Sequence, residues 1–302
     1  MDEGRGTEVV TMDRFSEANR CNWNDRAEIH AADRTGFYRL DQLRAGGDLL
    51  TEIEGALLAD VSGKHVLHLQ CHIGSDTLSI ARRGALVTGL DFSSTALGVA
   101  RRLAAETRLC ATFIEGDVLR TRELVDGHFD IVFASWGAIN WIADIAAWMS
   151  VAASMLRPGG SLILVEGHPC FTQLEESDGQ LVHAYPFRTP VEGPCGEADP
   201  FTYTGDPTPI ENAMCYGWDH PLSDIIMGAI GAGLVIRSVA EHDRVAWRQI
   251  PSMVPAGPGL YRLPDGMLGP PLSFSLVATR PADFPSAAPS DRNDGQRNPC
   301  FS

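Results

Sequence analysis

The sequence predicts an α/β protein built on a doubly wound, mostly parallel, seven-stranded sheet with helices on both faces. Three observations indicate this fold. Between about residues 61 and 166, short apolar runs alternate with segments of helical spacing, a pattern that specifies parallel strands joined by crossover helices. The run 161–165 is apolar on both sides, as a central parallel strand requires. A chain of 302 residues with 44% hydrophobic content can bury one good-sized core.

The apolar runs place the expected elements along the chain. Strands are expected near 65–70, 86–91, 111–115, 129–134, 160–166, 234–241 and 272–279, and helices near 75–83, 94–106, 142–156 and 223–232.

The segments around these elements define the expected domain organisation. Residues 1–18 are polar and predict a flexible N-terminus, and residues 19–60 have helical spacing and predict a helical cover. Residues 61–280 form the core, in which the Pro- and Gly-rich stretch 167–217 is too long for an ordinary connection and predicts an inserted substrate lid with short strands. The tail 281–302 has the composition of a disordered segment.

Charge and cysteine content exclude several classes of function. With 24 basic and 39 acidic residues, the net charge of −15 would repel a nucleic acid. The seven cysteines have no paired spacing and no signal peptide is evident, which predicts a cytoplasmic protein. The longest apolar run, 225–236, is far shorter than the ~20 residues that cross a bilayer, so no membrane partner is expected. A homodimer is compatible with the sequence.

The segment 64–74 (K-H-V-L-H-L-Q-C-H-I-G), followed by Gly89-Leu90-Asp91, is typical of a nucleoside site. Ligands of open α/β sheets lie beyond the carboxyl ends of the strands, and an acid about 20 residues past the first turn can accept protons from both ribose hydroxyls. Gln70 and His72 stand where a pyrophosphate-binding turn has glycines. The sequence therefore favours a nucleoside without phosphate, such as S-adenosylmethionine.

This segment and three further motifs make the chain resemble the class I S-adenosylmethionine-dependent methyltransferases over about residues 19–280. The motifs are 115–118 (E-G-D-V), 129–136 (F-D-I-V-F-A-S-W) and 156–166 (L-R-P-G-G-S-L-I-L-V-E). The resemblance implies a Rossmann-like fold whose last strand is antiparallel, S-adenosylmethionine as cofactor and S-adenosylhomocysteine as its product. It also implies that Asp117 approaches the adenine amino group. The first motif, L-Q-C-H-x-G, has fewer glycines than the family usually has there. This difference affects the contacts expected around the amino-acid end of the cofactor.

The N-terminal cover contributes three candidate cofactor contacts. Trp23, Arg26 and His30 share one helical face, so that the arginine could pair with the methionyl carboxylate and the tryptophan could cover the sulfonium. An amphipathic helix that only packs onto the sheet would show the same spacing. The full set of expected cofactor-binding residues is Trp23, Arg26, His30, Leu69, Gln70, His72, Gly74, Asp91, Phe92, Ser93, Asp117, Val118, Ser135 and Trp136.

Candidate catalytic residues follow the fifth strand. Glu166 and His168 come at its carboxyl end, where either could accept a proton from a methyl acceptor. Alternatively, Glu166 caps neighbouring N–H groups and His168 only begins the lid.

Four residues are expected to bind the substrate: Trp136, Trp141, Trp218 and His220. Trp136 and Trp141 follow the fourth strand and offer flat walls, although Trp141 could equally be core. His220 could return to the pocket, or its segment could only cap the next helix through Asp219. No metal is expected, because the four possible ligands within 65–72 fall on opposite faces of a strand and match no usual zinc spacing.

The resulting hypothesis is methyl transfer to a small molecule of specialised metabolism, such as antibiotic biosynthesis, with an aromatic or heteroaromatic acceptor. Methylation of carbon, nitrogen or oxygen stays open, and an indole-like carbon acceptor is included. Two alternatives keep the fold: an NAD-dependent oxidoreductase, which the missing glycines oppose, and a nucleoside-binding protein without catalysis.

Overall fold

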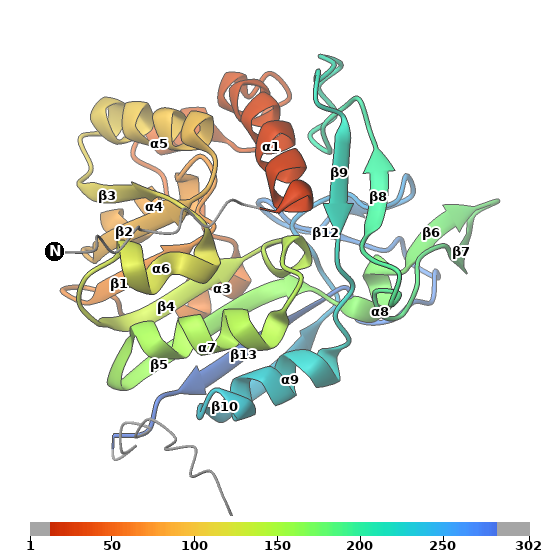
Figure 1. The fold of residues 1–302 in the computed structure, drawn as a ribbon. Helices are drawn as coiled ribbons and strands as arrows, with labels where there is room; N and C mark the ends of the chain where they lie inside the picture. Colours follow the sequence, from red (N-terminus) through yellow and green to blue (C-terminus); the bar gives the residue numbers. More distant parts are fainter. Residues whose placement is uncertain (1–12, 283–302) are drawn as a thin grey trace, which may run out of the picture.

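The computed structural model describes residues 13–282. Its centre is a seven-stranded sheet in the order β10-β13-β5-β4-β1-β2-β3, in which β13 is antiparallel to both of its neighbours (Figure 1). The strands are β1 (His65–Leu69), β2 (Leu86–Asp91), β3 (Ala111–Glu115), β4 (Phe129–Ser135), β5 (Leu156–Gly167), β10 (Val235–His242) and β13 (Ser273–Thr279). The mostly parallel sheet and its antiparallel last strand confirm the expected fold.

Helices cover both faces of this sheet because successive residues of each strand point to opposite sides. In β1, Val66 packs in a cluster with Ile53 of α3 (Glu52–Leu57), whereas its neighbour Leu67 packs in a cluster with Trp148 of α7 (Ile145–Met155). The helices are α1 (Arg14–Ala32), α2 (Leu40–Arg44), α3 (Glu52–Leu57), α4 (Ser75–Arg82), α5 (Ser94–Thr107), α6 (Thr121–Leu124), α7 (Ile145–Met155), α8 (Pro169–Thr172) and α9 (Leu222–Gly231), with 3-10 turns η1 (Val118–Arg120) and η2 (Ile139–Trp141).

The N-terminal cover begins earlier than the sequence predicted. Helix α1 starts at Arg14, because the side chain of Asp13 accepts hydrogen bonds from the backbone N–H groups of Phe15 and Ser16, which caps the helix. Residues 14–18 are therefore helical, in contrast to the flexible N-terminus expected through residue 18. Residues 1–12 and 283–302, which include most of the tail expected to be disordered, lie outside the described residues.

The expected lid consists of α8 and two short hairpins. The first pairs β6 (Leu174–Ser177) with β7 (Gln180–His183), and the second pairs β8 (Cys195–Ala198) with β9 (Met214–Gly217). A further small hairpin, β11 (Val254–Pro255) with β12 (Tyr261–Arg262), comes between β10 and β13 and was not expected.

Helix α1 holds the second hairpin of the lid in place. Asn19 exchanges two hydrogen bonds with the backbone of Tyr216 in β9, at 2.9 and 2.8 Å. The Nδ2 of Asn22 donates to the carbonyl oxygen of Asn212, at 2.7 Å. In Figure 1 α1 and β9 accordingly run side by side. The N-terminal cover and the lid thus form one roof.

Between residues 13 and 282, no helix combines the length and the apolar composition that crossing a membrane would require.

Candidate functional site

The carboxyl ends of the parallel strands open into a cavity of about 790 Å³, which α1, the lid and the segment 246–261 enclose. Thirteen of the residues singled out in the sequence line this cavity: Trp23, Gln70, His72, Asp91, Phe92, Asp117, Val118, Ser135, Trp136, Trp141, Glu166, Trp218 and His220. Six do not, namely Arg26, His30, Leu69, Gly74, Ser93 and His168. The cavity lies at the edge of the sheet where an open α/β fold binds its ligand.

Asp91 ends β2 and links two turns at the floor of the cavity. Its Oδ2 accepts the backbone N–H of His72 at 2.8 Å, and its Oδ1 accepts that of Ser93 at 2.9 Å. Burial raises the pKa of Asp91 to about 6, against the lowering effect of these backbone donors. The second lone pair of each carboxylate oxygen can still accept a hydroxyl proton from a ligand.

The turn after β1 adopts the backbone of a glycine turn without its glycines. Gln70 and His72 have φ angles of 54° and 50°, in the left-handed region that glycine enters without steric cost. The Gln70 amide compensates by bridging two elements, because its Nε2 donates to the carbonyl of Ala138 at 2.7 Å and its Oε1 accepts the indole N–H of Trp148 at 2.9 Å. The side chain of Gln70 therefore fixes the turn.

Gly74 ends this turn and is packed too closely for any other residue. Its φ is 74°, and a Cβ there would lie 2.8 Å from the Cβ of Ala100 in α5. Its role is to bring α4 against α5, which explains why it does not line the cavity.

Asp117 and Val118 follow β3 at the far end of the same floor. Asp117 caps η1 by accepting the backbone N–H of Leu119 at 2.8 Å. Val118 packs in the core cluster of α7. Both residues still border the cavity, and the adenine contact expected of Asp117 stays a prediction.

Ser93 and Leu69 support this floor from behind. Ser93 caps α5 through the backbone N–H of Ala96 at 3.0 Å, and Leu69 is fully buried in the core. Neither residue lines the cavity, although both were expected to contact the cofactor directly.

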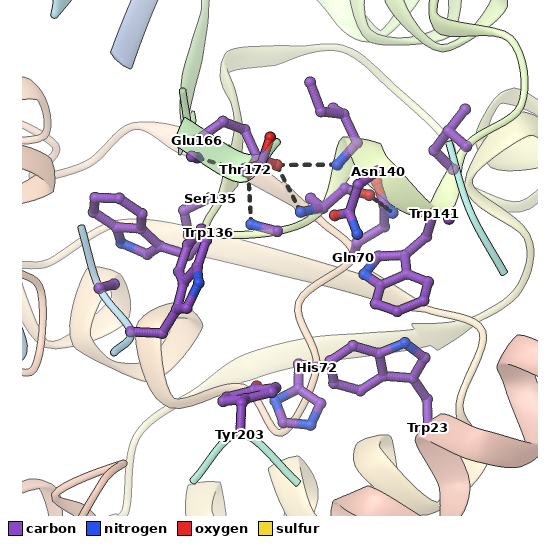
Figure 2. A pocket seen from close by; sticks show the side chains of 18 of the residues that line it. Trp23, Gln70, His72, Ser135, Trp136, Asn140, Trp141, Glu166, Thr172 and Tyr203 are labelled. Carbon is purple, nitrogen blue, oxygen red and sulfur yellow. Dashed lines mark hydrogen bonds between the residues drawn. The ribbon is translucent and has the colours of Figure 1, made fainter. Parts of the chain in front are cut away.

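Glu166, at the end of β5, holds the turn that follows β4. Its two carboxylate oxygens accept the backbone N–H groups of Gly137, Ala138 and Ile139 at 2.6, 2.6 and 3.0 Å (Figure 2). Burial raises the pKa of Glu166, and these donors act in the opposite direction. The contacts favour the capping role that the sequence left as an alternative to general base.

His168 was expected beside a methyl acceptor, but the structure directs it away from the cavity. Its Nδ1 accepts the backbone N–H of Cys170 at 3.1 Å and caps α8, and its Nε2 lies 3.0 Å from a carboxylate oxygen of Glu241 in β10. The ring packs edge-on against Phe274 of β13. The pairing of β5 with β13 continues to Gly167 and determines this direction.

Arg26 and His30 also lie behind the cavity wall rather than in it. The guanidinium carbon of Arg26 is 5.7 Å from the Trp23 ring centre and 6.0 Å from that of Tyr203. The Nδ1 of His30 lies 3.1 Å from Nε2 of His72. Of the expected helical face, Trp23 alone borders the cavity, and the other two residues support it and its neighbours.

Aromatic side chains form most of the remaining wall. The rings of Trp23 and Trp141 meet edge to face with centres 5.4 Å apart, and Trp136 lies across from them (Figure 2). Twelve aromatic residues line the cavity: Trp23, Phe37, Tyr38, Phe92, Trp136, Trp141, Tyr185, Phe187, Tyr203, Trp218, Trp247 and Tyr261. This arrangement suits a flat or apolar ligand.

The segment 218–220 returns to the cavity, and the capping alternative is wrong. Helix α9 begins after Pro221 and has no side-chain cap. Instead, Nε2 of His220 donates to the carbonyl of Ile142 at 2.7 Å, and the backbone N–H of Trp218 donates to the carbonyl of Asn140 at 2.8 Å. These bonds attach the segment to η2.

Sequence reasoning missed a polar group on the side of α3 and α4, made by Arg39, Glu54 and Asp76. All three line the cavity. Glu54 is the last member of a capping box, Thr51-x-x-Glu54, whose pattern is visible in the sequence. That pattern explains one carboxylate oxygen of Glu54 but gives no indication that the side chain also faces a cavity.

His68 was not expected to bind a metal. Its Nδ1 lies 2.9 Å from the hydroxyl oxygen of Thr77.

Across residues 13–282, no three His, Cys, Asp or Glu side chains are grouped so as to hold a metal ion.

Comparison with known proteins finds similarity in the core. Residues 66–160 match the family described as methyltransferase domain. The ubiquinone biosynthesis O-methyltransferase of Aromatoleum aromaticum is 28% identical over 151 residues, which are 50% of this chain and 59% of that protein. The demethylmenaquinone methyltransferase of Thermus thermophilus is 34% identical over 130 residues, which are 42% of this chain and 58% of that protein. The match therefore spans about three fifths of the length of these relatives.

Solved structures agree with the fold. An S-adenosylmethionine dependent methyltransferase from Mesorhizobium loti superimposes with a TM-score of 0.50 at 18% identity, covering 83% of this chain and 100% of that chain. Magnesium protoporphyrin IX methyltransferase from Synechocystis PCC 6803, with bound S-adenosylmethionine, gives a TM-score of 0.50 at 17% identity over 90% of this chain and 100% of that chain. The chain thus shares the Rossmann-like fold of these methyltransferases, and its residues 66–160 match the family described as methyltransferase domain.

Proposed function

We propose that this protein transfers the methyl group of S-adenosylmethionine to a small aromatic or heteroaromatic molecule. The observation that carries the proposal is the single continuous cavity, with Asp91 and Asp117 on its floor and twelve aromatic residues in its walls. Its volume of about 790 Å³ lies in the usual range for small-molecule sites. One end has the features of a nucleoside site, and the other end leaves room for an acceptor.

The residues at the floor fit an adenosine better than a dinucleotide. Asp91 is buried at the end of β2, where its carboxylate would accept the ribose hydroxyl protons. The backbone N–H of His72, which a phosphate-binding turn would point at its ligand, already donates to Asp91. With side chains at residues 70 and 72, the turn lacks the open backbone that a pyrophosphate needs, which opposes the NAD alternative.

When bound, the cofactor supplies a methyl group on a sulfonium, an already good leaving group. The task left to the chain is to align the acceptor and exclude water. Trp23, Trp136 and Trp141 offer faces against which a planar acceptor can stack, and their indole rings also suit a cationic sulfonium. Within this proposal Glu166 positions Trp136 and η2 and does not take the acceptor's proton, because its oxygens already bind three N–H groups.

The acceptor class is supported by the aromatic walls and, more generally, by the relatives, whose names refer to ubiquinone biosynthesis and to demethylmenaquinone. Specialised metabolism, including antibiotic biosynthesis, is the setting we propose, since the lid provides a large enclosed wall for an elaborate small molecule. The methylated atom, whether carbon, nitrogen or oxygen, stays open. We also propose a cytoplasmic location, supported by the six cysteines of residues 13–282, all of which are unpaired.

Isothermal titration calorimetry of the purified chain tests the cofactor assignment. We expect S-adenosylmethionine and S-adenosylhomocysteine to bind with at least tenfold higher affinity than NAD. Tighter binding of NAD would overturn the proposal. The acceptor is then sought by transfer of a deuterated methyl group from the cofactor to a panel of indoles, phenols and aromatic amines, with mass spectrometry as the readout. Tight cofactor binding without transfer to any acceptor would favour the non-catalytic nucleoside-binding alternative.

A further inference from the structure

Asn140, in η2, differs from the other side-chain amides that line the cavity. Four amides do so among the described residues, from Gln70, Asn140, Gln173 and Gln249. In three of them the NH2 group already donates to backbone carbonyls: Gln70 to Ala138 at 2.7 Å, Gln173 to Pro169 at 2.5 Å, and Gln249 to Phe171 and Leu174 at 2.9 and 3.0 Å. The side chain of Asn140 makes no hydrogen bond to any residue that the structure describes.

The two ends of the Asn140 amide have different surroundings. Its Oδ1 is shielded from solvent and has no hydrogen-bond partner among the described residues. This oxygen faces its own turn, where a Cβ at Gly137 would lie 3.7 Å from it. The residue as a whole is partly exposed and lines the cavity, so the NH2 group is the end that is open to a ligand. Burying an amide oxygen without a donor costs stability, which favours a role in binding rather than in folding.

Contacts on both sides hold the backbone of Asn140 in place. The turn follows β4, and Glu166 accepts the N–H groups of residues 137–139 just before it. On its other side, the carbonyl of Asn140 accepts the N–H of Trp218 at 2.8 Å. In Figure 2 the amide lies between Trp136 and Trp141. A planar molecule that these rings hold would therefore meet an NH2 group that is already fixed in position.

The charges around the cavity restrict the kind of group that this amide can meet. Among the described residues that line the cavity, eight are acidic and Arg39 alone is an arginine or lysine. Burial, and next the charge of Arg26, lower the pKa of His72 to about 3, so this imidazole adds no positive charge. A carboxylate or phosphate on the acceptor would find little compensation there. A neutral carbonyl oxygen or ring nitrogen can accept the N–H without that cost.

We propose that Asn140 binds the methyl acceptor, by donating a hydrogen bond from its NH2 group to a neutral carbonyl oxygen or pyridine-type nitrogen. The cavity then selects ring systems that carry such an atom over ring systems of the same shape that lack it. The inference rests on the proposed function and names a feature of its substrate. A carboxamide does not take up a proton near neutral pH, so Asn140 selects and orients the acceptor and is not its base.

The test replaces Asn140 by leucine, which has a similar size and no polar group. Asn140→Ala is the second variant in case the first one unfolds, and both keep the backbone carbonyl that binds Trp218. Gln249→Met is the matched control, because Gln249 lines the same cavity but its NH2 group already has its partners.

The first arm measures the midpoint of thermal unfolding of each chain without ligands. We expect Asn140→Leu to raise the midpoint by about 1–3 °C, because an unpaired buried oxygen is removed. Gln249→Met should lower it, because two backbone carbonyls lose their donor. If Asn140→Leu is destabilised as much as this control, the amide serves the fold and the inference is overturned.

The second arm saturates the protein with S-adenosylhomocysteine and measures dissociation constants by calorimetry for pairs of similar shape. The pairs are benzimidazole with indole, and p-hydroxybenzaldehyde with p-vinylphenol, of which only the first member has the accepting nitrogen or carbonyl. For at least one pair, we expect the ratio of the two constants to favour the first member about fivefold more in the wild type than in Asn140→Leu. Gln249→Met should keep the wild-type ratio.

The affinity for S-adenosylhomocysteine separates the acceptor from the cofactor, and it should stay within about twofold in Asn140→Leu. A larger loss would assign the amide to the cofactor and overturn the inference, as would ratios that are the same in the wild type and in Asn140→Leu for both pairs. A wild-type chain that binds S-adenosylhomocysteine but no member of either pair would overturn the proposed acceptor class together with this inference. A chain that does not bind S-adenosylhomocysteine would overturn the proposed function itself.

Discussion

Over β1 to β3, the floor of the cavity consists of two short turns, whereas the roof on its acceptor side consists of segments brought together from distant parts of the chain. Asp91 joins the first two turns within 21 residues, through the N–H groups of His72 and Ser93. The roof combines α1 with β9, almost 200 residues apart in the sequence, through Asn19 and Tyr216. Local contacts therefore define the nucleoside side, and long-range contacts define the acceptor side.

Glu166 connects the two sides, and its removal should have the largest effect on stability. Glu166→Ala leaves three backbone N–H groups at residues 137–139 without their acceptor, two of them buried. We expect a loss of ~3–5 kcal/mol in the free energy of unfolding, measured by urea denaturation. Glu166→Gln should lose less, because the amide oxygen still accepts. A native-like stability for the alanine variant would show that the turn is held in another way.

Asp91→Ala tests the nucleoside side. It removes the acceptor for the ribose hydroxyls and for two turn N–H groups, so we expect at least a tenfold loss of affinity for S-adenosylhomocysteine, or ~1.5–3 kcal/mol. Calorimetry measures this loss. An unchanged affinity would show that Asp91 does not bind the ribose.

The same residue predicts a pH dependence of cofactor binding. The pKa of Asp91 is raised to about 6 by burial, so the carboxylate that accepts the ribose protons is lost as the pH falls through this value. If only the ionised form binds well, the affinity for S-adenosylhomocysteine should fall by about tenfold between pH 7.5 and pH 5. The folded state also binds the proton more tightly than the unfolded state, so Asp91 contributes less to stability as the pH rises from about 4 to 6.

Binding measured over this pH range in Asp91→Asn provides the control. The asparagine cannot titrate, so its affinity should be weak at every pH and nearly flat. A wild-type profile equally flat would indicate that Asp91 does not contact the ribose.

Asn19→Ala tests the acceptor side, with the smallest expected effect. It removes both hydrogen bonds between α1 and β9, for a loss of about 1 kcal/mol in stability. Because the contact holds the lid, the KM for an acceptor should rise severalfold while the dissociation constant of S-adenosylhomocysteine stays within about twofold. An equal loss for both ligands would argue against separate sides.

The sequence allowed the sheet, its helices and the nucleoside side to be predicted because each depends on local patterns. Apolar runs gave strands close to their observed bounds. Asp91 ends one strand, and His72 and Asp117 follow the ends of two others, which parallel topology brings to one edge. The start of α1 was missed, since the cap at Asp13 lies in a polar stretch that has no apolar period.

Residues on the acceptor side were predicted less well, because their directions depend on tertiary contacts. His168 follows the ligand edge in sequence, but the pairing of β5 with β13 directs it toward Glu241. Arg26 and Trp23 were expected on one helical face, yet the packing of Tyr203 leaves only Trp23 at the cavity. Glu54 has the pattern of a helix cap, and only the packed structure shows that it also faces the cavity.

A crystal structure of the chain soaked with S-adenosylhomocysteine would show whether the nucleoside binds at this floor. We expect the adenosine to lie over the carboxyl ends of β1 to β3, with both ribose hydroxyls within hydrogen-bonding distance of Asp91 and the sulfur directed toward Trp136. Density for the nucleoside elsewhere, or a ribose that does not touch Asp91, would contradict the account.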